Sequence, residues 1–147
     1  MLRSARFEFR TREEAVAIAR WLGALVPDSA CTEFALLELM INAIEHGNLE
    51  IGAHHKSELV RAGALDAEIA RRLAEPCYRD RVAWLDVLRS DDMTAYTVGD
   101  SGPGFAWQTV DEPGPDRPSG RGLSLVRQLS DSLEFNPTGN VVTVRLR

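Results

Sequence analysis

The sequence lacks the features that mark disulfide-rich, membrane-spanning and nucleic-acid-binding proteins. Its two cysteines, Cys31 and Cys77, match no metal-binding or redox spacing, so we interpret both as free thiols. No apolar run approaches the roughly 18 residues of a membrane span, and the N-terminal residues are typical of a strand rather than a signal peptide. Basic residues form no long cluster, and the net charge of −5 argues against a nucleic-acid or anionic-membrane partner. We therefore expect a cytoplasmic protein.

The residues that are present suit one compact domain. The chain has 147 residues, of which 44% are hydrophobic, and this is enough for a substantial core but too little for two ordinary domains. A capping-box pattern at 11–14 predicts the start of a helix. The other predicted elements, assigned from periodicity and from proline and glycine positions, are a strand at 6–10, a helix from 28 or 29 to about 47, a helical insert at 52–80, strands at 82–88 and 95–98, a long loop, a helix at 120–129 and a hairpin at 132–147.

The predicted insert contains two adjacent histidines, His54 and His55, which could suggest a metal site. Adjacent residues on a helix point about 100° apart. No cysteine or cluster of acidic ligands accompanies the pair. Solvated histidines are the favoured interpretation.

One predicted helix carries polar residues where its neighbours are apolar. Residues four apart on a helix drift by only about 40°, so Glu38, Asn42 and His46 fall on one stripe. A carboxylate, an amide and an imidazole among apolar flanks must be solvated, paired or bound to a ligand. The pattern therefore indicates a ligand site, although a water-facing stripe is the simpler explanation when the pattern is taken alone.

Two glycine-rich turns add to this stripe. A predicted strand runs directly into Asp100-x-Gly102-x-Gly104, and Gly120-x-Gly122 opens the next predicted helix. Glycines at a helix start let the backbone approach a ligand closely, and the free amides with the helix dipole favour phosphate.

Taken in order, these motifs resemble the Bergerat ATP-binding fold, the histidine kinase-like ATPase superfamily that includes gyrase-type ATPases, sensor histidine kinases and mismatch-repair ATPases. The resemblance covers residues 33–147. It implies an α+β fold, a two-layer α/β sandwich with a mixed sheet and helices on one face. The whole chain, 1–147, would be a single ATP-binding domain with a helical insert at about 52–80 and an ATP lid at about 105–121.

Within this superfamily, the sequences of residues 42–48 and 120–123 are most similar to the corresponding motifs of bacterial anti-sigma-factor serine/threonine kinases. The insert resembles versions attached to receiver or phosphatase domains. The resemblance implies an ATP-dependent protein serine/threonine kinase that phosphorylates or sequesters a regulatory partner, an anti-sigma antagonist or a sigma factor, and that forms a homodimer. The alternative is a nucleotide-gated binding module without phosphoryl transfer. A sensor histidine kinase core is less favoured, because no hairpin with a phosphoacceptor histidine fits before residue 33.

The resemblance also implies roles in binding ATP and Mg²⁺. Asp100 would accept a hydrogen bond from the adenine amine, which guanine lacks. Gly102 and Gly104 would pass under the base, and Thr143 would bond the ring nitrogens directly or through water. Asn42 would supply an oxygen to Mg²⁺, which draws its other ligands from water and phosphates.

At the phosphate end, the implied residues belong to the second glycine turn and to the polar stripe. Glu38, about 6 Å along the helix from the magnesium ligand, would be the general base for a serine, threonine or water nucleophile. Glu45 and His46 would line this end, or His46 would merely cap the helix. The phosphate-binding residues would be Gly120, Arg121, Gly122 and Leu123, with the Arg121 or Arg117 side chain neutralising the γ-phosphate.

The last predicted strand has two different faces, and this affects the expected adenine contact. Thr143 shares a face with Val141, whereas Val142, Val144 and Leu146 form a more apolar face. If Thr143 meets adenine, the apolar face points away from the nucleotide. We therefore expect a second sheet layer or a second subunit to cover it, unless Thr143 is simply at the edge of an ordinary core.

Overall fold

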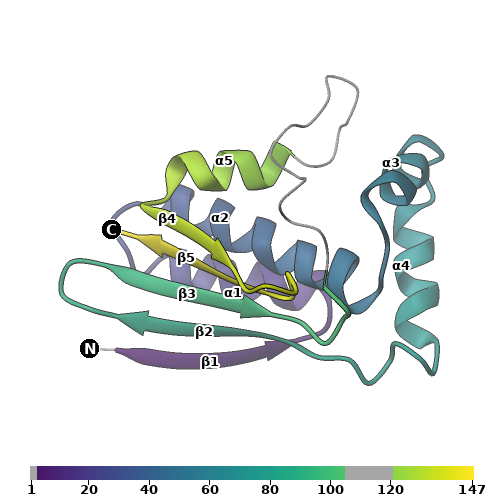
Figure 1. Ribbon diagram of the computed structural model, residues 1–147, viewed down its shortest axis with the longest axis horizontal. Helices are drawn as coiled ribbons and strands as arrows, with labels where there is room; N and C mark the ends of the chain where they lie inside the picture. The colour runs from purple at the N-terminus through teal and green to yellow at the C-terminus, as the bar shows by residue number, and fades with distance from the viewer. Residues whose placement is uncertain (1–2, 105–120) are drawn as a thin grey trace.

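In the computed structural model, which describes residues 3–104 and 121–147, one sheet is covered by helices on one face (Figure 1). The sheet order is β1-β2-β3-β5-β4. The strands are β1 (Ser4–Phe9), β2 (Ala83–Arg89), β3 (Thr94–Gly99), β4 (Ser132–Phe135) and β5 (Val141–Leu146). The predicted α+β, two-layer sandwich is confirmed.

The sheet differs from the prediction in one respect: among the described strands every pairing is antiparallel, so the expected mixed sheet is wrong. Two of the pairs, β2 with β3 and β4 with β5, are joined by short turns that reverse the chain. Helices lie between β1 and β2 in the chain, and a helix and β4 lie between β3 and β5. The pairing of β3 with β5 places Thr97 opposite Thr143.

The helical layer consists of α1 (Arg12–Gly23), α2 (Ser29–Asn42) and α5 (Arg121–Leu129). The predicted capping box starts α1, because the Thr11 hydroxyl accepts from the Glu14 amide and the Glu14 carboxylate accepts from the Thr11 amide, both at 3.2 Å. Asp28 caps α2 through the Cys31 amide at 3.3 Å. None of the described helices combines the length and the apolar character needed to cross a bilayer.

A pair of helices stands apart from this layer, at one end of the sandwich (Figure 1). They are α3 (Ala53–Arg61) and α4 (Leu65–Ala74), and they occupy the segment for which a helical insert is predicted. The end of the sandwich beside them is also where α2 passes into a π-helix, η1 (Ala43–Asn48).

The core lies between the sheet and the helices. Alternate residues of β5, namely Val142, Val144 and Leu146, are buried there with Leu36 and Met40 of α2. The apolar face of β5 is therefore covered by the chain's own helices, and the expectation of a second sheet layer or subunit over it is wrong. The reason is that the more apolar face of β5 packs against the helical layer, as an amphipathic strand does in a two-layer fold.

Neighbouring residues on the two faces of β5 give a stability test. Val144→Ala should lower the free energy of unfolding by about 2 kcal/mol, because Val144 is fully buried. Thr143→Ala removes a hydroxyl bonded to Thr97 at 2.9 Å on the other face, and should cost no more than about 1 kcal/mol. Urea denaturation measures both values. Equal costs would contradict this assignment of the faces.

Candidate functional site

A cavity of about 510 Å³ lies between the helices and the ends of the central strands. Its walls come from α2, η1 and α3 on one side, and from the ends of β3 and β5 and the first turn of α5 on the other. This volume is in the range typical of small-ligand sites. The cavity therefore marks the candidate site.

Most of the predicted site residues meet in this cavity. Those that line it are Glu38, Asn42, His46, Asp100, Gly104, Gly122 and Leu123. They come from α2, η1, the turn after β3 and α5, which are far apart in the sequence. Their convergence is the main structural support for a common role.

Other predicted residues do not line the cavity or cannot be placed. Gly102 lies just behind the wall, where its amide donates to Asp100 Oδ1 at 2.8 Å. Thr143 is absent from the lining, because β5 turns it to the face opposite Val142, where its hydroxyl bonds Thr97. The structure thus corrects its expected position against the adenine. Gly120, Arg117 and residues 105–120 of the predicted lid lie outside the described residues, as does the side chain of Arg121.

The helix that carries Glu38 and Asn42 does not continue as an α-helix to His46. Residues Ala43–Asn48 form the π-helix η1, and the Leu49 amide bonds the Ile44 carbonyl at 2.9 Å. Single π-helical turns inside helices are frequent at functional sites. His46 still lines the cavity together with Glu38 and Asn42, although it lies in the π-helical turn.

His46 has a structural bond as well as a place in the cavity wall. Its Nδ1 donates to the Ile51 carbonyl, which fixes the ring orientation. Burial lowers the pKa of His46, although the carbonyl bond acts in the opposite direction. The ring is therefore neutral at neutral pH, and neither of its two predicted roles excludes the other.

Asp100 is held at the end of β3 by very close packing. The side chain is 7% exposed, and a Cβ atom at Gly47 would lie 2.2 Å from its carboxyl carbon. Only glycine at position 47 leaves room for the carboxylate here. Burial raises the pKa of Asp100 to about 6, while the Gly102 amide and the positive charge of Arg81 oppose this shift.

Two further contacts hold η1 against the turn that comes after β3. Asn48 Oδ1 accepts from the Ser101 amide at 2.8 Å. A Cβ atom at Gly102 would lie 2.2 Å from the Gly47 carbonyl oxygen, so the two backbones touch. The glycines of the first turn therefore allow backbone contact between η1 and the strand end.

Glu38 reaches across the cavity to the start of α5. A Cβ atom at Gly122 would lie 1.9 Å from Glu38 Oε2, so the carboxylate packs directly against the first helical turn. Burial raises the pKa of Glu38, the positive charge of Lys56 lowers it and the charge of Glu45 raises it. The result is a carboxylate that is more basic than a solvated one, placed beside free helix amides.

The helical insert contributes a wall of the cavity that was not predicted from the sequence. Along α3, residues Ala53, Lys56, Ser57 and Val60 all line the cavity, at the i, i+3, i+4, i+7 spacing of one helix face. Lys56 Nζ forms an ion pair with Oε1 of Glu45 at 2.5 Å, and Glu45 is 2% exposed. Glu45 is therefore a buried partner of Lys56 and does not line the pocket as predicted. The spacing on α3 was the available signal.

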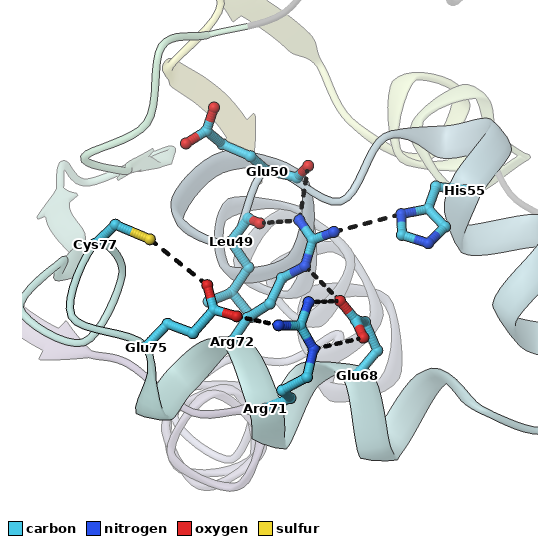
Figure 2. A network of polar contacts seen from close by, with 8 residues as sticks. All are labelled: Leu49, Glu50, His55, Glu68, Arg71, Arg72, Glu75 and Cys77. Carbon is cyan, nitrogen blue, oxygen red and sulfur yellow. Dashed lines mark hydrogen bonds and ion pairs between the residues drawn. The ribbon is translucent and has the colours of Figure 1, made fainter.

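The second helix of the insert is tied to the segment immediately after η1 (Figure 2). Arg72 donates to the Leu49 carbonyl at 2.7 Å and to the Glu50 carbonyl at 3.2 Å, and its Nε donates to Glu68. Glu50 has a left-handed backbone, with φ 54°, and lines the cavity. Arg81 adds bonds to the Asn48 carbonyl and to the Glu50 carboxylate, at 2.8 and 2.7 Å.

The described residues contain no group of three or more histidine, cysteine, aspartate or glutamate side chains arranged to hold a metal ion. His54 is exposed and pairs with Glu58 at 3.1 Å, one helical turn away. His55 lies beside Arg72 at 3.5 Å. Each histidine of the insert therefore has a side-chain neighbour within the described residues.

A family model described as the histidine kinase-like ATPase domain matches residues 6–146, which is nearly the whole chain. No curated protein matches the chain.

The raised pKa of Asp100 predicts how stability depends on pH. A carboxyl whose folded pKa of about 6 exceeds its ordinary value of 3.8 favours folding when protonated, so this stabilisation is lost as the pH rises through 6. Asp100→Asn keeps the shape without the charge. Urea denaturation should find it more stable than the wild type by on the order of 1 to 3 kcal/mol at pH 8 and nearly equal at pH 4.

The exposed carboxylate of Asp92, in the turn between β2 and β3, provides the control for this test. Asp92→Asn should show no such pH-dependent difference. A difference between Asp100→Asn and the wild type that is the same at both pH values would contradict the assigned ionisation.

Proposed function

The chain belongs to the histidine kinase-like ATPase domain family, and we propose that it binds ATP with Mg²⁺ and phosphorylates a serine or threonine of a regulatory protein partner. One observation carries the proposal. The same cavity is lined by a buried carboxylate at a strand end, Asp100, and by a basic carboxylate, Glu38, packed against the first turn of a helix. The first suits a purine amine, and the second suits the site of phosphoryl transfer.

The adenine end is the part of the cavity around Asp100. Above its pKa of about 6 the carboxylate is an acceptor without a donor, so it matches the exocyclic amine of adenine and opposes the carbonyl of guanine. Val98, Val142 and Phe135 supply apolar surface to the same cavity. This combination of an apolar wall with one fixed acceptor supports selection of ATP.

The phosphate end is the part around α5 and Asn42. The first turn of α5 has free amides and the positive end of the helix dipole, both of which favour phosphate. Mg²⁺ keeps several waters and is usually held by few protein ligands together with phosphate oxygens. The Asn42 side chain, which lines the cavity, fits such an ion.

Glu38 would act as the general base. It would accept the proton of the attacking hydroxyl while the new bond forms between that oxygen and the γ-phosphorus. The bond from the γ-phosphorus to the bridging oxygen breaks, and ADP leaves with that electron pair. Burial beside Glu45 supports this role, because both effects raise the proton affinity of Glu38.

The proposed partner rests on the sequences of two motifs, residues 42–48 and 120–123, which resemble those of anti-sigma-factor kinases. By this resemblance the substrate is an anti-sigma antagonist, the sequestered protein is a sigma factor, and the working form is a homodimer. The helical wall α3–α4 is the part of the chain where recognition would differ from shorter members of that group.

The adenine contact is tested by Asp100→Asn. Both oxygens of the Asp100 carboxylate can accept a hydrogen bond from the purine amine. The asparagine side chain has only one acceptor oxygen, and its NH₂ group is a donor. Calorimetry at pH 8 should find ATP binding weakened by about 1 to 3 kcal/mol. Asp92→Asn should bind ATP like the wild type, and an unchanged dissociation constant in Asp100→Asn would remove Asp100 from the site.

The catalytic role is tested by Glu38→Gln with γ-labelled ATP and a purified anti-sigma antagonist protein as the proposed acceptor. Transfer of label to the partner should fall by about 10²-fold or more, as expected for loss of a general base, while ATP still binds. Glu33→Gln, on the same helix but outside the cavity, is the control. Unchanged transfer in Glu38→Gln would exclude the base role. ATP binding without transfer in the wild type would instead support a nucleotide-gated binding module.

A further inference from the structure

The cavity wall has an unusual balance of charge for a site that would hold a triphosphate. Three carboxylates line it, those of Glu38, Glu50 and Asp100. Among the described lining residues, Lys56 is the one lysine or arginine. It is also the only lysine in the whole sequence. A polyanion entering this cavity therefore meets a single permanent cation on the described wall, and it comes from the insert.

Within the described part of the chain, Lys56 forms one ion pair. Its partner is Oε1 of Glu45 at 2.5 Å, and the Lys56 side chain is 18% exposed whereas that of Glu45 is 2% exposed. An ammonium group has three donors, so one ion pair leaves capacity for a second acceptor. Lys56 is also among the residues that line the cavity.

Lys56 and Glu38 line the same cavity, and their charges interact. The positive charge of Lys56 lowers the pKa of Glu38, while Glu38 packs against Gly122 in the first turn of α5. Glu38 contacts Gly122, and Lys56 lines the same cavity. A carboxylate, the start of a helix and an ammonium group therefore all border this cavity.

The backbone beneath Lys56 is held in place by the second helix of the insert. Arg72 of α4 bonds the carbonyls of Leu49 and Glu50 and lies 3.5 Å from His55 of α3 (Figure 2). It therefore links both helices of the insert to the segment immediately after η1. Lys56 is thus presented by an anchored helix rather than by a free surface loop.

We propose that Lys56 is a phosphate-binding residue whose ammonium bridges the buried Glu45 carboxylate and the terminal phosphate of the bound nucleotide. The proposal rests on the proposed ATP site and adds a residue from the insert to it. Glu45 holds the ammonium in position, and α3 becomes a wall that distinguishes a triphosphate from a diphosphate. The simpler alternative is that Lys56 does no more than neutralise Glu45.

The two explanations predict different nucleotide preferences. Affinities for a non-hydrolysable ATP analogue and for ADP, each with Mg²⁺, would be measured by calorimetry. Lys56→Gln alone leaves Glu45 buried without a partner, and this can unfold the protein. The decisive protein is therefore the double variant Lys56→Gln with Glu45→Gln, which removes both charges and keeps two side chains that can hydrogen-bond each other.

In the double variant, affinity for the ATP analogue should fall about tenfold or more, as expected for loss of a charge-assisted hydrogen bond, while affinity for ADP stays nearly unchanged. Lys56→Arg should recover part of the loss. Arg61→Gln, which removes an exposed cation from the same helix, should change neither affinity.

An unchanged ratio of the two affinities in the double variant would overturn the Lys56 assignment while leaving the ATP site intact. If both affinities fall equally, the ammonium does not distinguish the terminal phosphate, and the assignment also fails. If the wild type binds neither nucleotide, the proposed function fails and the Lys56 assignment fails with it.

Discussion

The contact between η1 and the end of β3 is the constraint on which the site depends. Gly47 has no side chain, so the Asp100 carboxylate can pack against it and remain buried at the edge of the cavity. The Gly102 backbone touches the Gly47 carbonyl, and Asn48 bonds the Ser101 amide. Any side chain at position 47 would force the helix and the strand apart, and the buried acceptor would lose its fixed position.

Local features explain how much of this could be predicted from the sequence. The Thr11 capping box, the strand alternation and the glycine turn after Asp100 depend on residues close together in the chain, and each agrees with the structure. The predicted side for Thr143 did not agree. Alternation shows that two faces of a strand differ, but which face meets a ligand depends on where the helices lie, and this is a tertiary property.

The π-helix and the role of the insert escaped prediction for a related reason. Periodicity assumes about 100° per residue, so it predicts one continuous α-helix through His46, whereas the structure has a π-helix from Ala43 to Asn48. The sequence predicts a helical insert, but it does not identify the partner of Lys56, which is a buried residue of another helix. A sequence pattern cannot distinguish a charged residue that pairs with a residue of another helix from a charged residue that faces water.

The π-helical turn makes chain length as important as residue identity at this point. Each residue removed from a helix rotates all later residues of that helix by about 100°. A one-residue deletion within Ala43–Asn48 would swing Gly47 away from Asp100 even if every remaining side chain were kept. Both the number of residues along η1 and their identity are therefore constrained, because the contacts of Gly47 and Asn48 depend on where those residues fall as well as on what they are.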